Sequence, residues 1–207
     1  MTPGRTFIRK CSRCSKPISQ RTVKSGNTFG AIWWTDGWYR AAMLPDQPRL
    51  VACPHCHATL WIDELEKLGV LDNATIQAGE FAEVLPYLSL SHEDYLVLIS
   101  EGAATRDKER YARLRAWWAG NDRRRRGVAE IPLTPAEASN LTAVAQLLDE
   151  SVANDLVMKA EVLRELGRFA DASALFARMA EGVNQRVAAI IRRLVDECDP
   201  YVRRLPN

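Results

Sequence analysis

Hydrophobic and polar residues alternate in the first third of the chain. Residues 29–35 and 38–43 are two β-prone runs on either side of Asp36-Gly37. Asp-Gly between two such runs predicts a two-residue hairpin with a type I′ turn. Residues 49–52 and 58–62 predict a second hairpin with a cysteine pair at its tip. Because side chains alternate along a strand, Trp33 and Trp34 are expected on opposite faces, one of them outward.

From about residue 63 the pattern becomes helical. Residues 63–69 predict a short helix, with carboxylates in its first turn and a glycine at its end. Ser91 is expected to begin a second helix, whose apolar face holds Tyr95, Leu98 and Ile99. Thr105 is expected to cap a third, with an apolar stripe made by Tyr111, Leu114 and Trp118.

A further helical region follows a predicted linker at residues 128–132. Thr134-Pro135-Ala136-Glu137 combines a capping-box pair with proline at the first helical position. Short breaks then separate four expected helices, which short connections make antiparallel neighbours, at about 135–149, 152–166, 169–181 and 183–198. The predicted fold class is therefore α+β, with an antiparallel β region followed by an all-α region.

Composition restricts the class of protein. The chain has 207 residues, of which 47% are hydrophobic and 26% charged, and this balance excludes a disordered chain. Residues 1–10 have no apolar core, so they predict no secretory signal, and no apolar run approaches the roughly 20 residues of a membrane helix. We expect a cytoplasmic, bacterial protein whose cysteines bind metal or are buried.

Two Cys-x-x-Cys pairs, Cys11 with Cys14 and Cys53 with Cys56, are separated by 38 residues. Two thiolates on one tight turn can reach the same ion, and two such turns complete a tetrahedron around Zn²⁺. Four thiolates leave no position for water, which makes the predicted role structural. The alternatives are a redox dithiol in either pair, or replacement of one thiolate by a neighbouring histidine (His55 or His57).

The spacing and the aromatic hairpins resemble zinc-ribbon domains over about residues 8–62. The resemblance implies an antiparallel β ribbon with one structural Zn²⁺ per chain. Cys198, in the last expected helix, has no partner at ligand spacing and is expected to be a buried or idle thiol. The ribbon's exposed aromatics are expected either to pack within the fold or to contact a partner, and the candidates are Trp33, Trp34 and Trp38.

Charge is strongly segregated although the net charge is only +2. The balance is +7 over residues 1–62, −8 over 63–101, +6 over 102–126 and −3 over 127–207. Opposite blocks can pair inside the fold or meet charged partners. The strongest basic run is expected to be exposed and to contact nucleic acid or a partner, unless it is a solvated loop or binds the acidic block: Arg123, Arg124, Arg125 and Arg126.

Residues 153–180 resemble one tetratricopeptide-type helix pair. Small residues at Ala160 and Ala172 allow two helices to approach closely, Gly167 makes the turn, and Phe169 and Phe176 fill the seam. The sequence holds no second copy with all these positions, and a tetratricopeptide array needs about three repeats. An irregular helical bundle is the alternative. The resemblance implies a scaffold that binds protein.

The sequence holds no recognised catalytic motif: it lacks a Gly-rich phosphate loop, a Gly-x-Ser-x-Gly elbow and a His-Glu-x-x-His pair. We therefore expect a non-catalytic adaptor that binds another protein, with a zinc-ribbon domain (1–62), connecting helices with the basic segment (63–127) and a tetratricopeptide-like domain (128–207). The alternative is a nucleic-acid-binding or regulatory protein that uses the basic ribbon and residues 106–126. An enzyme is the third option.

Overall fold

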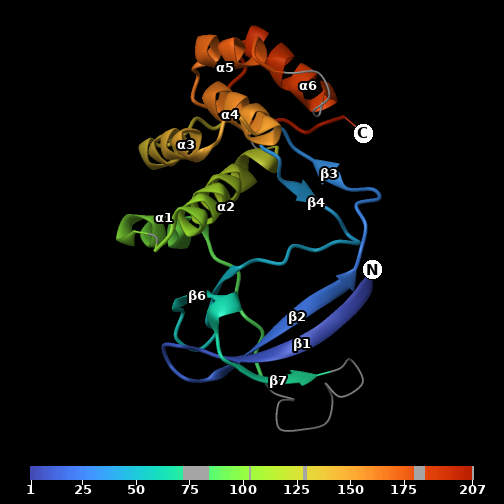
Figure 1. The fold of residues 1–207 in the computed structure, drawn as a ribbon, viewed down its shortest axis with the longest axis vertical. Helices are drawn as coiled ribbons and strands as arrows, with labels where there is room; N and C mark the ends of the chain where they lie inside the picture. Colours follow the sequence, from blue (N-terminus) through green and yellow to red (C-terminus); the bar gives the residue numbers. More distant parts are fainter. Residues whose placement is uncertain (72–83, 103, 128–129, 180–184, 207) are drawn as a thin grey trace. The chain divides into compact units, whose positions relative to one another are not determined.

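The computed structural model describes residues 1–71, 84–102, 104–127, 130–179 and 185–206 (Figure 1). The chain divides into two compact units, one of Met1–Ala31 with Arg40–Asp94 and one of Ile32–Tyr39 with Tyr95–Asn207. Antiparallel strands dominate the first unit and helices the second, which confirms the α+β class. None of the described helices is long and apolar enough to span a bilayer.

The first unit is built on a three-stranded antiparallel sheet. Its strand order is β2 (Pro17–Ser25), β1 (Thr2–Lys10) and β7 (Lys67–Leu71). The predicted hairpin around the second cysteine pair is confirmed as β5 (Leu50–Ala52) and β6 (Thr59–Trp61). A small apolar cluster holds these hairpins, and two of its members are cysteines: Cys11, Ile18, Val51, Cys53, Leu60, Ile62 and Leu65.

The helix predicted over residues 63–69 is wrong. A single 3₁₀ turn, η1 (Ile62–Glu64), ends at Leu65, whose backbone is extended (φ −76°, ψ 140°). The chain then enters β7, where Val70 pairs with Phe7 of β1. A helix of seven residues is marginal in water, because nucleation costs more than so few hydrogen bonds return. Pairing with the open edge of β1 therefore decides the structure.

The described α-helices lie in the second unit, apart from His92–Asp94 at the start of the first one, and most of their predicted starts are confirmed. They are α1 (His92–Glu101), α2 (Arg106–Arg125), α3 (Pro135–Leu147), α4 (Ala153–Glu165), α5 (Phe169–Phe176) and α6 (Gln185–Asp196). Thr105 and Thr134 cap α2 and α3, and Thr134 forms the full capping box with Glu137. Residues 128–129 of the predicted linker, and the chain between α5 and α6 at 180–184, lie outside the described residues.

The buried stripe of α2 is rotated from the predicted one. Leu114 and Trp118 are only partly buried and pack against the edge of the core, and Tyr111 is also only partly buried. The buried positions are instead mostly small: Ala112, Ala116, Trp117, Gly120 and Asn121. Small residues let neighbouring elements come close to the helix, and Asn121 brings a polar group into the interior.

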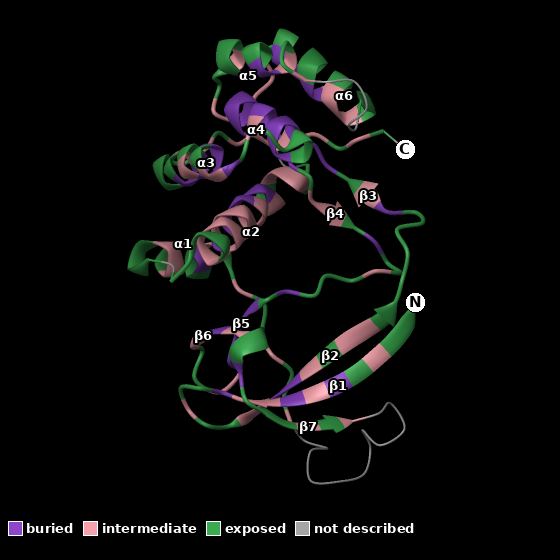
Figure 2. Ribbon diagram, in the orientation of Figure 1, coloured by how far each residue is buried: buried purple, intermediate pink, exposed green. Residues whose placement is uncertain are grey.

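Helix α4 is the most extensively buried helix of the second unit (Figure 2). Ala160 on α4 and Ala172 on α5 are fully buried in one cluster with residues of α6. Gly167, at φ +71°, makes the turn between α4 and α5, where the Arg168 N–H donates to the Leu163 carbonyl oxygen at 2.8 Å. The predicted close approach of this helix pair is thus present.

The Asp-Gly hairpin belongs to the helical unit. Its strands are β3 (Ile32–Trp33) and β4 (Tyr39–Arg40), and Trp34 N–H donates to the Trp38 carbonyl oxygen at 3.0 Å. Within this turn, only Gly37 has a positive φ (+80°), so the turn is a three-residue loop that ends in a left-handed glycine. A type I′ turn needs positive φ at both central residues, so the predicted turn type is wrong. Trp33 is 39% exposed and Trp34 9%, which confirms that one of them faces outward.

The C-terminal segment pairs with this hairpin at an isolated antiparallel bridge between Trp34 and Arg204. Thr35 N–H donates to the Arg203 carbonyl oxygen at 2.9 Å, and Leu205 N–H donates to the Trp33 carbonyl oxygen at 2.8 Å. Residues 33–35 and 203–205, far apart in the sequence, therefore pair within one unit.

A buried polar cluster explains why the hairpin adopts this position. Asp36, which is 1% exposed, forms an ion pair with Arg125 of α2 and accepts a hydrogen bond from Asn121 Nδ2 at 3.0 Å. Asn121 also donates to Glu165 of α4, and Trp117 Nε1 donates to the same carboxyl at 2.9 Å. The tip of the hairpin is thus bonded to two helices of the second unit.

A second buried ion pair lies beside this cluster. Arg164 and Glu161 are both fully buried, and Arg164 Nη2 lies 2.6 Å from Glu161 Oε1. The cluster therefore combines three carboxyl groups with two guanidinium groups. Burial, followed by the charges of Glu161 and Asp36, raises the pKa of the Glu165 carboxyl to about 8. This environment favours the protonated form of the Glu165 carboxyl at neutral pH.

Asp36→Ala is expected to lower the free energy of unfolding by about 3–5 kcal/mol, because it removes the buried counter-charge of Arg125 and leaves this guanidinium paired only with Asp122, whose side chain is 49% exposed. The matched control is Asp171→Ala, which removes an exposed ion pair with Arg168 (side chains 52% and 53% exposed) and is expected to cost at most about 1 kcal/mol. Urea unfolding followed by circular dichroism measures both. Equal effects of the two substitutions would contradict the structural role of Asp36.

Glu165→Gln is expected to change the pH dependence of stability. The pKa of Glu165 is raised in the folded state, so the stability linked to its proton is complete below its ordinary pKa of 4.5 and is lost as pH rises toward about 8. Across this interval the stability of the native protein should fall relative to Glu165→Gln by up to about 1.4 kcal/mol per pH unit. Parallel stability profiles of the two proteins would refute the prediction. Glu197→Gln, at an exposed carboxylate, is the control.

Candidate metal centre

Two loops of the first unit have the same backbone geometry. Residues 11–16 connect β1 to β2, and residues 53–58 connect β5 to β6. In each loop, the residue after the second cysteine is left-handed: Ser15 has φ 61° and His57 has φ 56°. The N–H of this residue donates to the carbonyl oxygen of the first cysteine at 2.9 Å in both loops. Each Cys-x-x-Cys pair therefore lies on a tight turn that directs both sulfur atoms to one side.

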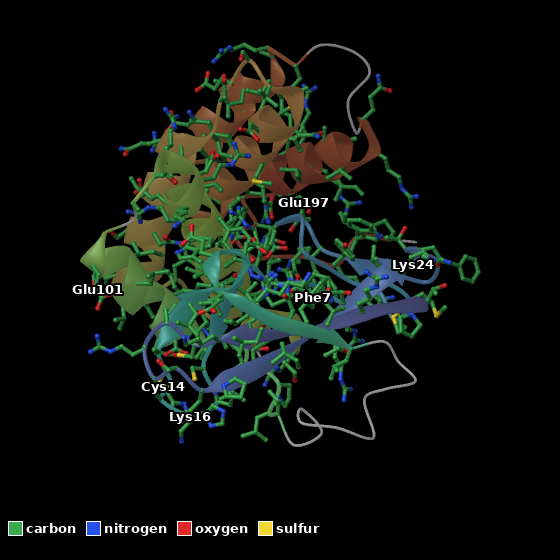
Figure 3. All side chains as sticks on the ribbon, turned by 60° about the horizontal axis from the view of Figure 1, so that its bottom comes forward. Phe7, Cys14, Lys16, Lys24, Glu101 and Glu197 are labelled. Carbon is green, nitrogen blue, oxygen red and sulfur yellow. The ribbon has the colours of Figure 1, made fainter. Side chains whose placement is uncertain are left out.

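The four predicted cysteines come together. Their Sγ atoms all lie within 4.8 Å of one another. The closest pairs join the two loops, at 3.9 Å between Cys11 and Cys56 and at 3.7 Å between Cys14 and Cys53. A Zn–S bond of about 2.3 Å gives tetrahedral edges of about 3.8 Å. The spacing of the sulfur atoms thus fits one tetrahedral metal ion, and Figure 3 shows Cys14 at this end of the β1–β2 hairpin.

Backbone N–H groups also donate hydrogen bonds to the sulfur atoms, which favours their negatively charged thiolate form. Arg13 N–H and Cys14 N–H donate to Cys11 Sγ at 3.4 and 3.5 Å, and His55 N–H donates to Cys53 Sγ at 3.4 Å. Burial acts to raise the pKa of Cys11, but the N–H groups of Cys14 and Arg13 lower it to about 7. Burial raises the pKa of the Cys53 thiol to about 12. A divalent cation would supply the positive charge that four thiolates need.

Neither histidine belongs to this cluster within the part of the chain that the structure describes. His55 Nε2 lies 3.2 Å from the Pro17 carbonyl oxygen, and His57 is exposed. A strand rather than a helix follows each cysteine pair, unlike the helix start at which a redox dithiol usually lies. Cys198 lies two residues beyond the end of α6 and is exposed, so of the two expected states, a buried or an idle thiol, the buried one is wrong.

The four-arginine run is only partly exposed, contrary to the prediction. Helix α2 continues to Arg125, so successive side chains point in different directions around it. The side chain of Arg124 is 5% exposed and forms an ion pair with Glu137, and that of Arg125 is 4% exposed and forms one with Asp36. Burial acts to raise the pKa of Glu137, but hydrogen bonds from Arg124 and the Thr134 N–H lower it to about 2.

The outer members of the run differ from these two. Arg123 is 44% exposed at its side chain and lies 2.8 Å from Glu137, and Arg126 is exposed. The guanidinium carbon of Arg125 lies 4.5 Å from the centre of the Trp38 ring and 5.8 Å from that of Trp34. Two of the three tryptophans considered as partner contacts therefore pack within the fold, and Trp33 keeps a half-exposed side chain.

Sequence reasoning missed a cavity in the second unit. It has a volume of about 530 Å³, within the range typical of ligand-binding pockets. Most of its walls are apolar side chains from β3, α4, α6 and the C-terminal segment, including Trp33, Trp34, Val157, Met158, Ile190 and Leu205. The outward-facing Trp33 was its one sequence signal, since the other walls meet only through tertiary packing.

Comparisons of the chain with protein-family models, with curated proteins and with solved structures found no match. The function is therefore inferred from the geometry and chemistry of the sites themselves.

Cys53→Ser is expected to remove a metal ion that the full chain otherwise holds at about one per chain, because three sulfur ligands and a hydroxyl bind it less tightly. Cys198→Ser, outside the cluster, should leave the metal content unchanged. Elemental analysis of the purified proteins measures both. A native chain without metal, or equal metal content in the Cys53→Ser and native proteins, would contradict the assignment.

Proposed function

We propose that the protein is a cytoplasmic, non-catalytic adaptor in which a structural Zn²⁺ holds the β-rich unit and the helical unit binds another protein. The observation that carries the proposal is the spacing of the four sulfur atoms. Thiolate ligands favour Zn²⁺ over Mg²⁺ and Ca²⁺. Since the protein supplies all four ligands, no position is open for water or substrate, and the ion acts on the fold. Free thiols suit a reducing compartment.

The zinc ion would replace a large apolar core in the first unit. The apolar cluster there contains Cys11 and Cys53 as members, so the metal centre and the core are continuous. In such a site the binding free energy of the metal is folding free energy. The ion thus fixes the two cysteine hairpins against each other.

The helical unit supports the binding half of the proposal. The pair α4–α5 resembles a tetratricopeptide unit, and α6 packs against the same cluster. An extended tetratricopeptide groove needs about three repeats, which makes the cavity beside Trp33 the better candidate for contact. An apolar pocket beside a half-exposed tryptophan suits an apolar anchor residue of a partner protein.

The arginine-rich segment gives less support to the alternative nucleic-acid function. Arg124 and Arg125 would have to leave buried ion pairs before they could meet phosphates. Breaking such pairs is costly, because it leaves buried charges without partners. Arg123 and Arg126 alone retain exposed guanidinium groups in this run.

Capture from the native host tests the adaptor function with matched variants. A tagged native chain is expected to retain a partner protein after nuclease treatment. Trp33→Ala should reduce its recovery at least about tenfold, as expected when a pocket loses an aromatic wall that contacts the partner's anchor residue. Phe29→Ala, at an aromatic that is 89% exposed and does not line the cavity, should have no effect. Recovery that is independent of Trp33, or that nuclease abolishes, would contradict the proposal.

A further inference from the structure

The sheet of the first unit presents an aromatic side chain on its more exposed face. Phe7 lies on the central strand β1 and pairs with Gln20 of β2 and with Val70 of β7. Directly paired residues lie on the same face of a sheet. Val70 is 38% exposed and Phe7 partly exposed, whereas the neighbouring Thr6 and Ile8, on the opposite face, are 5% and 0% exposed. The Phe7 ring is therefore at the centre of a surface that solvent reaches.

Two cations flank this ring. Lys67 Nζ lies 4.6 Å, and the guanidinium carbon of Arg9 5.6 Å, from the centre of the Phe7 ring. Arg9 is held by neutral acceptors, since its Nε donates to Gln20 Oε1 at 2.8 Å and its Nη1 to the Leu65 carbonyl oxygen at 3.1 Å. These hydrogen bonds orient the guanidinium group and leave its charge intact.

The positive charge of this surface is not neutralised within the described ranges. No described carboxylate lies within ion-pair distance of Arg9 or Lys67. The adjacent Lys10 differs, because it pairs with Glu66 at 3.3 Å. Further basic residues lie along the same hairpin, and Figure 3 shows Phe7 between Lys24 toward one end and Lys16 at the other. The surface thus combines an aromatic ring with two cations, Arg9 and Lys67.

We propose that this face binds single-stranded nucleic acid, with a base stacked on Phe7 and with Lys67 and Arg9 on the flanking phosphates. An accessible aromatic ring beside a basic track is the chemistry that recognises unpaired bases, because every base offers a π-face. Paired bases are stacked inside a duplex and do not reach the ring. The inference is independent of the adaptor function, which uses the cavity of the second unit.

Lys67 is the group that must move when a base binds. Its ammonium lies over the ring that the base would occupy, and its side chain is exposed. A lysine has a flexible four-carbon stem and a strongly hydrated charge. The Lys67 ammonium can therefore move from the Phe7 ring to a phosphate without a change in the backbone. Arg9, held by Gln20, keeps its place.

Fluorescence anisotropy of labelled oligothymidylate and oligouridylate, about 12 nucleotides long to cover one site, tests the proposal on the metal-loaded full chain. Phe7→Leu is expected to weaken binding about tenfold, and Phe7→Trp to preserve it. Lys67→Gln with Arg9→Gln should also lower the slope of log affinity against log salt by about 1.4, since each phosphate contact on a single strand contributes about 0.7.

Matched controls separate this site from general attraction. Phe29→Leu removes an exposed aromatic elsewhere, and Arg192→Gln with Arg193→Gln removes two exposed charges from α6; neither should change affinity by more than about twofold. The proposal is overturned if neither oligonucleotide binds at low salt, if a duplex binds equally well, or if the controls weaken binding as much as the site variants. If the Phe7→Leu variant loses its metal, the Lys67→Gln variant is used to test the proposal instead. An affinity and a salt slope that are unchanged in Lys67→Gln would then overturn the proposal.

Discussion

Four sulfur atoms from two distant loops converge on one point, and the first unit depends on this convergence. Each loop closes its own hairpin, so placing Cys11 and Cys14 against Cys53 and Cys56 also places β1–β2 against β5–β6. The cost of closing so long a loop between the cysteine pairs must be offset by the ion and by a small apolar cluster that includes two of the ligands. Burial raises the pKa of the Cys53 thiol and so disfavours its thiolate form. The positive charge of a bound ion would favour that thiolate.

The chain between the two cysteine pairs contributes to both units, since β2 and β5 lie in the first unit and residues 32–39 in the second. Its hairpin joins the helical unit through Asp36, whose carboxylate meets Arg125 and Asn121 in the interior. The C-terminal segment pairs with the same hairpin at Thr35. This interior holds more carboxyl groups than guanidinium groups, and the raised pKa of Glu165 favours its neutral form there. Buried polar contacts of this kind specify a position, because a misplaced partner leaves a charge without compensation.

Local signals in the sequence predicted local structure well. The caps at Thr105 and Thr134, the Asp-Gly hairpin and the two cysteine turns each depend on residues within a few positions of one another. The two cysteine pairs were also predicted to meet, because their shared ligand chemistry marks them in the sequence, but other features that depend on distant partners were missed. Strand β7 forms because β1 has an edge to which it can pair. The sequence of residues 67–71 alone does not indicate that this edge is present. Arg124 and Arg125 looked like a free basic run, because their buried partners, Glu137 and Asp36, are fixed by tertiary packing.

X-ray absorption at the zinc edge of the purified full chain tests the central claim most directly. Four sulfur scatterers at about 2.3 Å, with no nitrogen or oxygen in the first shell, are the predicted result. Nitrogen or oxygen scatterers near 2.0–2.1 Å in place of one or more sulfurs would contradict the closed four-cysteine centre, and with it the structural role assigned to the ion.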